Sequence, residues 1–384
     1  MNVDVILAAI KDVVPTPAAL HEPLIDGNAW AYVKDCLDSG WVSSVGSYVD
    51  RLEQDLAVLT GAKFAVATVN GTAALHCCLL LAGVESGDEV LMPSLTFIAT
   101  ANAASYCGAI PHFVECEELT LGVDPIKLAE YLNDIVDIRG GKAVNRQSGR
   151  TVRALVCMHT FGHPADLDPL IKICGELGIV LVEDAAESLG SMYKGHHCGT
   201  QTSLAALSFN GNKIVTSGGG GAILTNDEAL AKKAKHITTT AKVSHKWNFN
   251  HDQIGFNYRL PNVNAAIGCA QLESLPKFLA SKRHLAEQYI TAFENVPDVK
   301  VFKEPKHATS NYWLNTILLD KASTSNLETL LEATNSTGTM TRPAWNLMHR
   351  LPMYDSCPCM NLEVSENLSA RILNVPSSAR LGDL

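Results

Sequence analysis

The alternation of short apolar runs with helical patterns constrains the fold of this 384-residue chain more than any other feature. We expect strands at residues 64–69, 89–92, 110–114, 154–158, 179–182, 204–209 and 222–224, with helices at 73–82, 98–107, 125–133 and 167–177. Buried strands that alternate with helices are typical of a mostly parallel sheet covered on both faces. The predicted fold class is therefore α/β, with a mostly parallel central sheet flanked by helices.

The length of the chain predicts more than one domain, because a single small core does not organise 384 residues. We expect an N-terminal helical extension at 1–23, a large α/β domain at 24–254 and a small C-terminal α+β domain at 255–384. Residues 261–293 show the pattern of one long helix that starts at Pro261. Pro276 inside that pattern predicts a break or a kink.

The composition excludes several kinds of partner. A formal net charge of −10 argues against nucleic acid or an anionic membrane, because both require basic patches. No apolar run approaches the length of a membrane span, and the N-terminus lacks the basic region of a signal peptide. We therefore expect the eleven cysteines to be reduced thiols, and their spacing along the chain is not that of a metal site. We expect a cytoplasmic location and no bound metal.

Functional side chains are expected at the carboxyl ends of the strands, where ligands bind in parallel sheets. The residues that follow the predicted strands there are Gly71, Thr72, Phe97, His159, Asp184, Glu187, Ser208 and Lys213. Gly71 and Thr72 open a helix, whose free N–H groups bind anions. We interpret His159 as a structural, hydrogen-bonded histidine. Lys213 precedes four glycines, which suits the close approach of a bulky partner to a nucleophilic lysine, although a solvated lysine in a turn explains this stretch alone equally well.

These side chains together fit pyridoxal 5′-phosphate. Its phosphate would lie on Gly71, Thr72 and Ser208, its ring on Phe97, and its aldehyde would bond to Lys213. Asp184 would keep the ring nitrogen protonated. Each residue alone has an ordinary structural explanation, such as a helix cap or a core aromatic. That all of them stand at strand ends, in this order along the chain, favours the cofactor.

The sequence resembles the DegT/DnrJ/EryC1/StrS family of sugar aminotransferases, which have the fold of type I pyridoxal-phosphate enzymes. The resemblance covers nearly the whole chain, and its most specific motifs are Ser208-Phe209-Asn210-Gly211-Asn212-Lys213 and Gly255-Phe256-Asn257-Tyr258-Arg259-Leu260. Within the family the chain looks most similar to the nucleotide-sugar 4-aminotransferases of bacillosamine and legionaminic acid biosynthesis. Glu187 and Gly219 match this branch.

The resemblance implies the cofactor roles given above, with Glu187 near the oxygen of the cofactor ring. It implies that Asn257 reaches the phosphate of the neighbouring subunit, so that a homodimer shares its active sites. It further implies glutamate as amino donor and a UDP-linked 2-acetamido 4-keto-6-deoxy sugar as acceptor. The segment 342–346 and His349 also match the branch, and either sugar-nucleotide binding or a place in the interdomain core explains them.

Three alternatives stay open at this point. A GDP- or dTDP-linked keto sugar would need the same cofactor chemistry. A regulatory protein could bind the cofactor without turnover, although the loss of Lys213 or Asp184 would be its hallmark and both are present. A dehydratase of this family carries histidine in place of the lysine, so Lys213 disfavours it, and the segment 257–259 disfavours an aldolase or lyase.

Overall fold

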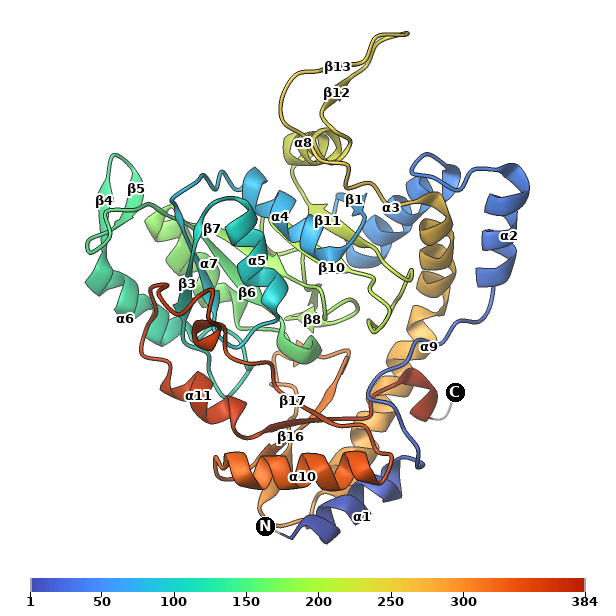
Figure 1. Cartoon of the computed structure of the whole chain (residues 1–384), viewed down its shortest axis with the longest axis vertical. Helices are drawn as coiled ribbons and strands as arrows, with labels where there is room; N and C mark the ends of the chain where they lie inside the picture. The colour runs from blue at the N-terminus through green and yellow to red at the C-terminus, as the bar shows by residue number, and fades with distance from the viewer. Residues whose placement is uncertain (1, 383–384) are drawn as a thin grey trace.

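A seven-stranded sheet forms the centre of the chain in the computed structural model, which describes residues 2–382 (Figure 1). The strand order is β1-β11-β10-β7-β6-β2-β3, and β11 alone is antiparallel to the other six strands. The strands are β1 (Phe64–Thr68), β2 (Glu89–Pro93), β3 (Ile110–Val114), β6 (Val152–Met158), β7 (Val180–Asp184), β10 (Leu204–Ser208) and β11 (Gly221–Thr225). The predicted mostly parallel sheet is confirmed.

Helices flank this sheet. They are α2 (Ala29–Ser39), α3 (Ser47–Thr60), α4 (Gly71–Leu81), α5 (Ile98–Tyr106), α6 (Pro125–Ile135), α7 (Leu167–Leu177) and α8 (Glu228–Thr238). Several begin at caps that the sequence supplies, as where the Asp124 side chain accepts from the N–H groups of Ile126 and Lys127 at the start of α6. The expected helices are therefore present, and each end lies within two residues of its predicted position.

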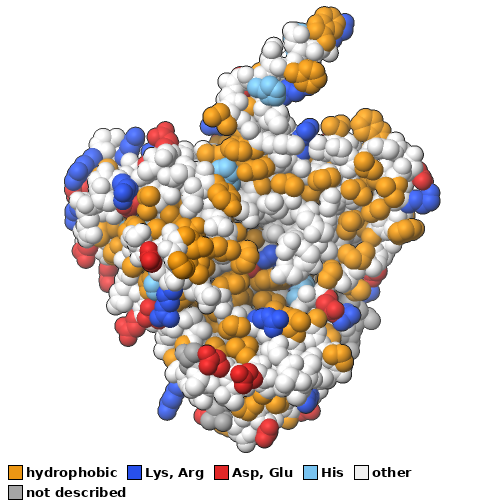
Figure 2. Space-filling view, in the orientation of Figure 1, with side chains coloured by type: hydrophobic (Ala, Val, Ile, Leu, Met, Phe, Trp, Pro, Cys, Tyr) orange, Lys and Arg blue, Asp and Glu red, His pale blue; other side chains and the backbone are white. Residues whose placement is uncertain are grey.

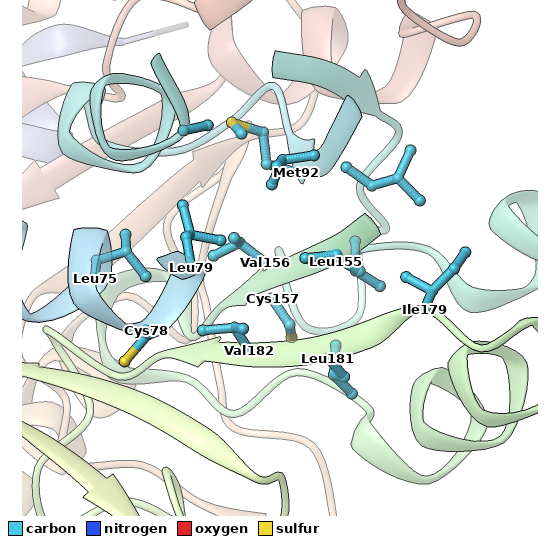
Figure 3. Packing of buried hydrophobic residues seen from close by; sticks show 14 of the residues in the cluster. Leu75, Cys78, Leu79, Met92, Leu155, Val156, Cys157, Ile179, Leu181 and Val182 are labelled. Atoms are coloured by element: carbon cyan, nitrogen blue, oxygen red, sulfur yellow. The ribbon is translucent and has the colours of Figure 1, made fainter. Parts of the chain in front are cut away.

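The main core lies between α4 and the middle of the sheet (Figure 3). Leu75, Cys78 and Leu79 of α4 are buried above Val156 and Val182 of the two central strands. Both faces of these strands are covered, so that residues 154–158 of β6 and 180–182 of β7 form continuous apolar runs rather than alternating ones. This burial fixes where the first turn of α4 meets the strand ends.

A single long helix, α9 (Asn262–Ala292), joins the large domain to the small one (Figure 1). Its first half packs against α2 and α3, and its second half against α1 (Val3–Val13). The sequence predicted a break or a kink at Pro276, and the break is wrong, because the helix continues through this residue. Pro276 itself lies on an exposed side of the helix, where its ring does not disturb the packing of the core.

The small domain contains a four-stranded antiparallel sheet of order β14-β16-β18-β17 with two helices. Its elements are β14 (Val299–Val301), β16 (Asn315–Leu319), β17 (Arg342–Pro343), β18 (Ile372–Val375), α10 (Thr324–Ser336) and α11 (Glu363–Ser369). Helix α1 packs its buried Ile6 and Ile10 into the same core as this sheet. The α+β character agrees with the prediction, whereas the exact domain boundaries stay predictions.

Short strands and single turns complete the chain. They are β4 (Val136–Arg139), β5 (Lys142–Asn145), β8 (Met192–Tyr193), β9 (His196–His197), β12 (Lys242–Val243), β13 (Asn250–His251), β15 (Ala308–Thr309) and the 3₁₀ turns η1 (Thr160–Gly162), η2 (Met348–Arg350) and η3 (Ala379–Leu381). The sequence analysis did not predict the β4–β5 hairpin, which overlaps a polar stretch of the chain at 139–150. The β12–β13 hairpin projects from the body of the molecule (Figure 1).

Lys282 of α9 is completely buried where the two domains meet, and backbone carbonyl groups hold its ammonium. Its Nζ donates to the carbonyl oxygen of Trp313, at 3.1 Å, and to that of Ser377. Burial lowers the pKa of Lys282 to about 7, because a charged ammonium loses its hydration there. The unfolded chain therefore binds more protons than the folded protein between about pH 7 and pH 10.

We expect the stability of the protein to rise with pH through this window, relative to a Lys282→Met variant. Between pH 7 and pH 9 the free energy of unfolding of the wild type should gain about 2 kcal/mol on that of the variant. Parallel denaturant titrations of both proteins at pH 7, 8 and 9 measure this difference. A difference that stays constant with pH would contradict the lowered pKa.

Candidate active site

A cavity of about 270 Å³ lies at the carboxyl edge of the sheet. Seven of the eight cofactor-site residues predicted from the sequence line it, and these are Gly71, Thr72, Phe97, Asp184, Glu187, Ser208 and Lys213. Asp184 and Ser208 are the last residues of β7 and β10, and Gly71 begins the helix that follows β1. The strand ends therefore gather in one place the side chains that the sequence keeps far apart.

The start of α4 forms one end of the cavity. Gly71 and Thr72 head the helix, where no preceding turn supplies acceptors for their N–H groups. The Asn70 side chain accepts from Ala73 N at 2.8 Å and caps the helix. Ser208 lies against Gly71 so closely that a Cβ at residue 71 would stand 2.7 Å from Ser208 Cβ. Helix N–H groups beside a hydroxyl group form a cradle suited to a phosphate group.

Asp184 places a buried carboxylate in the cavity. Thr100 Oγ1 donates to Asp184 Oδ2 at 2.8 Å, and Ala186 N donates to Oδ1 at 3.3 Å. Burial raises the pKa of Asp184, although these hydrogen bonds and the positive charge of Lys213 act in the opposite direction. A cationic N–H group placed in the cavity would relieve the cost of burying this charge.

Lys213 lies in the loop after β10, where its backbone N–H donates to Asn210 O at 3.0 Å. Its Nζ donates to Glu187 Oε1 at 3.0 Å. The other carboxylate oxygen of Glu187 accepts from Phe161 N at 2.9 Å, and burial raises the pKa of Glu187 to about 7. Lys213 is thus a nearly buried amine that faces the cavity beside a carboxyl group able to exchange protons near neutral pH.

Trp313 is the main contribution of the small domain to this site. Lys213 Nζ lies 3.9 Å from the centre of the Trp313 ring, within the range of a cation–π contact. The indole N–H of Trp313 donates to the carbonyl oxygen of Asn212 at 2.7 Å and so holds the lysine loop. The sequence analysis gave Trp313 no role in the site, because no local pattern around it marks a contact with a loop one hundred residues earlier.

Two aromatic rings lie at the open side of the cavity. Phe97 precedes α5, is 47% exposed, and has its ring centre 6.2 Å from that of Trp345. Trp345 also contacts Phe161, with ring centres 4.9 Å apart. Phe97 can therefore cover a flat ring bound in the cavity, as its sequence position predicts.

His159 and Asn257 stand apart from the cavity. His159 is buried, with Nε2 3.0 Å from Glu183 Oε2 and Nδ1 accepting from Ala165 N, which is the structural role expected for it. Asn257 is exposed, and its side-chain oxygen accepts from Arg259 at 3.4 Å. Within one chain nothing brings Asn257 to the cavity, so its cofactor role stays a prediction that needs a second subunit.

Residues 2–382 offer neither a metal centre nor a membrane-spanning helix. No group of three or more histidine, cysteine, aspartate or glutamate side chains could hold a metal ion in this part of the chain. Across the same residues, no helix is both long and apolar enough to cross a membrane.

Known proteins match both the sequence and the fold. Residues 23–383 match the DegT/DnrJ/EryC1/StrS aminotransferase family. The chain is 34% identical over 365 residues to GDP-perosamine synthase of Vibrio cholerae, covering 95% of each chain. The crystal structure of the aminotransferase TlmJ from Streptoalloteichus hindustanus is 27% identical with a TM-score of 0.85, over 95% of each chain. The structure of DesI with its TDP-sugar product is also 27% identical, with a TM-score of 0.81, over 96% of this chain and 91% of DesI.

The chain belongs to the DegT/DnrJ/EryC1/StrS aminotransferase family and has fold type I of the pyridoxal-phosphate enzymes. It is a sugar aminotransferase that uses pyridoxal 5′-phosphate. The residues of the cavity fit this cofactor, because a helix N-terminus, a buried carboxylate and a nearly buried lysine line one space. The similarity to GDP-perosamine synthase leaves the bacillosamine and legionaminic acid branch as a prediction.

A Gly71→Ala substitution tests the phosphate cradle. The added Cβ would stand 2.7 Å from Ser208 Cβ and 3.3 Å from Leu207 O, so α4 and β10 must separate. We expect the affinity for pyridoxal 5′-phosphate to fall about 10- to 100-fold, as for the loss of one to two charge-assisted hydrogen bonds. Absorbance titration with the cofactor measures this loss.

Gly219→Ala is the matched control for this variant. Its added Cβ would meet no atom within 4 Å, although the residue lies in the same glycine-rich region as Lys213. We expect its cofactor affinity to stay within about two-fold of the wild type. Equal losses in both variants would show that the close contact between Gly71 and Ser208 is irrelevant to binding.

Proposed function

We propose that this protein transfers an amino group from glutamate to C4 of a 4-keto-6-deoxy nucleotide sugar, with the UDP-linked 2-acetamido sugar as acceptor. The observation that carries the proposal is the nearly buried Lys213, held by Glu187 at 3.0 Å in the cavity that also contains Asp184. The hallmark of a regulatory protein without turnover would be the loss of Lys213 or Asp184, and both residues are present. The coarser assignment, a sugar aminotransferase, already follows from the family.

Each of these residues of the cavity has its own role in such a transfer. When bound, pyridoxal 5′-phosphate supplies an aldehyde carbon that accepts the amino group and passes it on, and a ring that accepts electrons. Lys213 Nζ is the base that removes the proton from the substrate carbon bearing nitrogen and later returns a proton. Glu187 holds Lys213 in place between these steps. Asp184 would place a negative charge beside the ring nitrogen and so favour its protonated form, and Phe97 would shield the ring from water.

The nucleotide and the sugar are the finer part of the proposal. Glu187 and Gly219 support the UDP-linked 2-acetamido acceptor, because both match the bacillosamine and legionaminic acid branch. The names of two similar proteins refer instead to a GDP-linked and a TDP-linked sugar. A panel of UDP-, GDP- and dTDP-linked 4-keto sugars, each offered with glutamate, decides between these acceptors. A cytoplasmic location stays part of the proposal.

Lys213→Ala should abolish turnover and leave the fold intact. The substitution removes only the amine that acts as base, and the other residues that line the cavity stay in place. We expect the variant to lack the absorbance band that the wild type forms on cofactor addition, so that glutamate produces no spectral change. Lys194→Ala serves as control, since Lys194 is an exposed lysine paired with Asp168. Turnover by the Lys213→Ala variant would overturn the assignment. A wild-type band that ignores glutamate would favour another donor or the regulator.

A homodimer with shared active sites is the second part of the proposal. The β12–β13 hairpin precedes Asn257 and projects from the body of the molecule with Trp247 and Phe249 69% and 77% exposed (Figures 1 and 2). Large exposed aromatic side chains on a projecting arm are typical of surfaces that bind another protein. A second copy of this chain would cover them and bring Asn257 to the phosphate of the neighbouring site.

Mixing two inactive variants tests this arrangement. Lys213→Ala and Asn257→Ala homodimers are each expected to have little activity, the first through loss of the base and the second through a weakened phosphate contact. If Asn257 acts across the dimer, a mixed dimer contains one intact site. Random reassembly then restores about a quarter of the wild-type sites. An Asn257→Ala variant with full activity, or no recovery on mixing, would contradict shared sites.

A further inference from the structure

Three stretches of the chain that are far apart in sequence meet beside the active-site cavity. They are the η1 turn, residues 187–191 after β7, and residues 310–313 of the small domain, just ahead of β16. Ser191 Oγ donates to the carbonyl oxygen of Gly162 in η1 at 2.7 Å, and Ser310 Oγ donates to the same oxygen at 3.0 Å. The small domain is therefore hydrogen-bonded to two segments of the large domain at this junction.

Asn311 is the residue that ties this junction together, and it is fully buried. Its Nδ2 donates to the carbonyl oxygens of Glu187 and Leu189, each at 2.9 Å. Its backbone N–H donates to Ser191 Oγ at 2.9 Å, and its Oδ1 accepts from Trp313 N at 2.8 Å. Both donors of the side-chain amide are thus used on the turn that carries Glu187.

The backbone around Asn311 has the unusual geometry that these contacts need. Gly162 has a φ of +94°, and a Cβ at this position would overlap Asn311 Oδ1, so only glycine fits. Tyr312 has a φ of 46°, in the left-handed region that side chains disfavour. Such a conformation persists only where the surrounding contacts over-determine it, and it concentrates at functional sites.

The contacts of Asn311 lead to Lys213 through one carboxyl group. Phe161 N donates to Glu187 Oε2 at 2.9 Å, and Lys213 Nζ donates to Glu187 Oε1 at 3.0 Å. Asn311 holds the backbone of Glu187, and the η1 turn that supplies Phe161 N packs against the Asn311 side chain. The position of the Glu187 carboxyl group and the position of its second donor therefore both depend on one residue of the small domain.

We propose that Asn311 is a positioning residue of the reaction, which holds Glu187 where its carboxyl group orients Lys213. Asn311 does not line the cavity, so it acts through Glu187 and not by contact with substrate or cofactor. The proposal rests on the proposed function in one respect, because it takes Lys213 as the base. The docking of the small domain then sets the geometry of the base, although Lys213 and Glu187 both belong to the large domain.

Asn311→Ala tests this role in the half-reaction that takes the amino group from the donor. We expect the rate constant at saturating donor to fall about 10- to 100-fold, because a small misplacement of a catalytic group costs this much. The donor concentration for half-saturation should change less than about three-fold, since Asn311 lies outside the cavity. Stopped-flow absorbance of the holoenzyme measures both quantities. A loss confined to donor binding would contradict a role in orienting the base.

Asn315→Ala is the matched control. Asn315 is also a buried asparagine of the same segment, but its side chain contacts Ser377 and not the turn at 187–191. We expect this substitution to lower the thermal stability and to leave the rate constant within about two-fold of the wild type. Equal losses of rate in the two variants would show a general effect of a cavity in the small domain, which would overturn the proposal.

A double variant separates action through Glu187 from other routes. Glu187→Ala alone removes the carboxyl group that Asn311 is proposed to position, and it should slow the half-reaction. Adding Asn311→Ala should then change the rate constant less than about two-fold, because the effects of residues that act as a unit are not additive. A further loss in the double variant would place the effect elsewhere, for example on Trp313. Either that result or an unchanged rate in Glu187→Ala would overturn the proposal.

Amide hydrogen exchange gives a readout that needs no turnover. The N–H of Phe161 is buried and donates to Glu187, so it should exchange at least about 10-fold faster in Asn311→Ala and at the wild-type rate in Asn315→Ala. Mass spectrometry of the holoenzyme with fragmentation resolves this amide. Exchange that is unchanged at Phe161, or equally faster throughout the small domain, would leave Asn311 with a structural role alone and overturn the proposal.

Asn311→Asp takes the place of Asn311→Ala in every measurement if the alanine variant does not fold. Aspartate keeps the size of the side chain and the acceptor for Trp313 N, but it lacks the amide donors to Glu187 and Leu189. The same loss of rate and the same faster exchange at Phe161 are expected. Wild-type behaviour of Asn311→Asp would overturn the proposal.

These outcomes separate the positioning role from the proposed function. If the wild type ignores glutamate but accepts another amino acid, the donor assignment fails and the half-reaction is measured with that donor. If no donor reacts, the proposed function fails, and the exchange of the Phe161 N–H still decides whether Asn311 holds Glu187. If Asn311→Ala reacts as fast as the wild type, the function stands and the positioning role fails.

Discussion

The parallel run of the central strands is the constraint on which the site depends. Strands β1, β2, β6, β7 and β10 point the same way, so the residues that follow them meet at one edge of the sheet. Strand β11 returns antiparallel between β1 and β10 and pairs Gly221 with Ser208 at that edge. The start of α4 then meets Ser208 where Gly71 has no side chain to keep them apart. The phosphate cradle is a consequence of this sheet order.

The electrostatics of the cavity follow from burial. Asp184 and Glu187 are both buried, and the pKa of each is raised because water no longer solvates its charge. Lys213 offsets part of this cost for Glu187 through a direct contact. Asp184 has hydrogen bonds from Thr100 and from Ala186 but no direct cationic partner within the described residues. A protonated ring nitrogen is the group that would complete its environment, which explains why a cofactor rather than a side chain belongs there.

The sequence predicted the parts of the site that local rules govern and missed those that tertiary packing governs. Gly71, Asp184 and Ser208 were found because each stands at a strand end or at the helix start that follows one. Trp313 reaches the cavity only through the docking of the small domain, which no local pattern encodes. Pro276 shows the same limit, because the effect of a proline on a helix depends on which face is exposed.

The residues that local patterns predict and those that depend on tertiary packing also differ in their place in the site. The groups suited to the bond-making steps come from consecutive strand ends of the large domain, whose positions the sheet fixes. Trp313 and Trp345 line the same cavity from the small domain, and their position depends on how that domain docks. Trp313 also contacts Lys213 directly. The small domain can therefore vary the wall of the cavity without moving the strand ends that position the other groups.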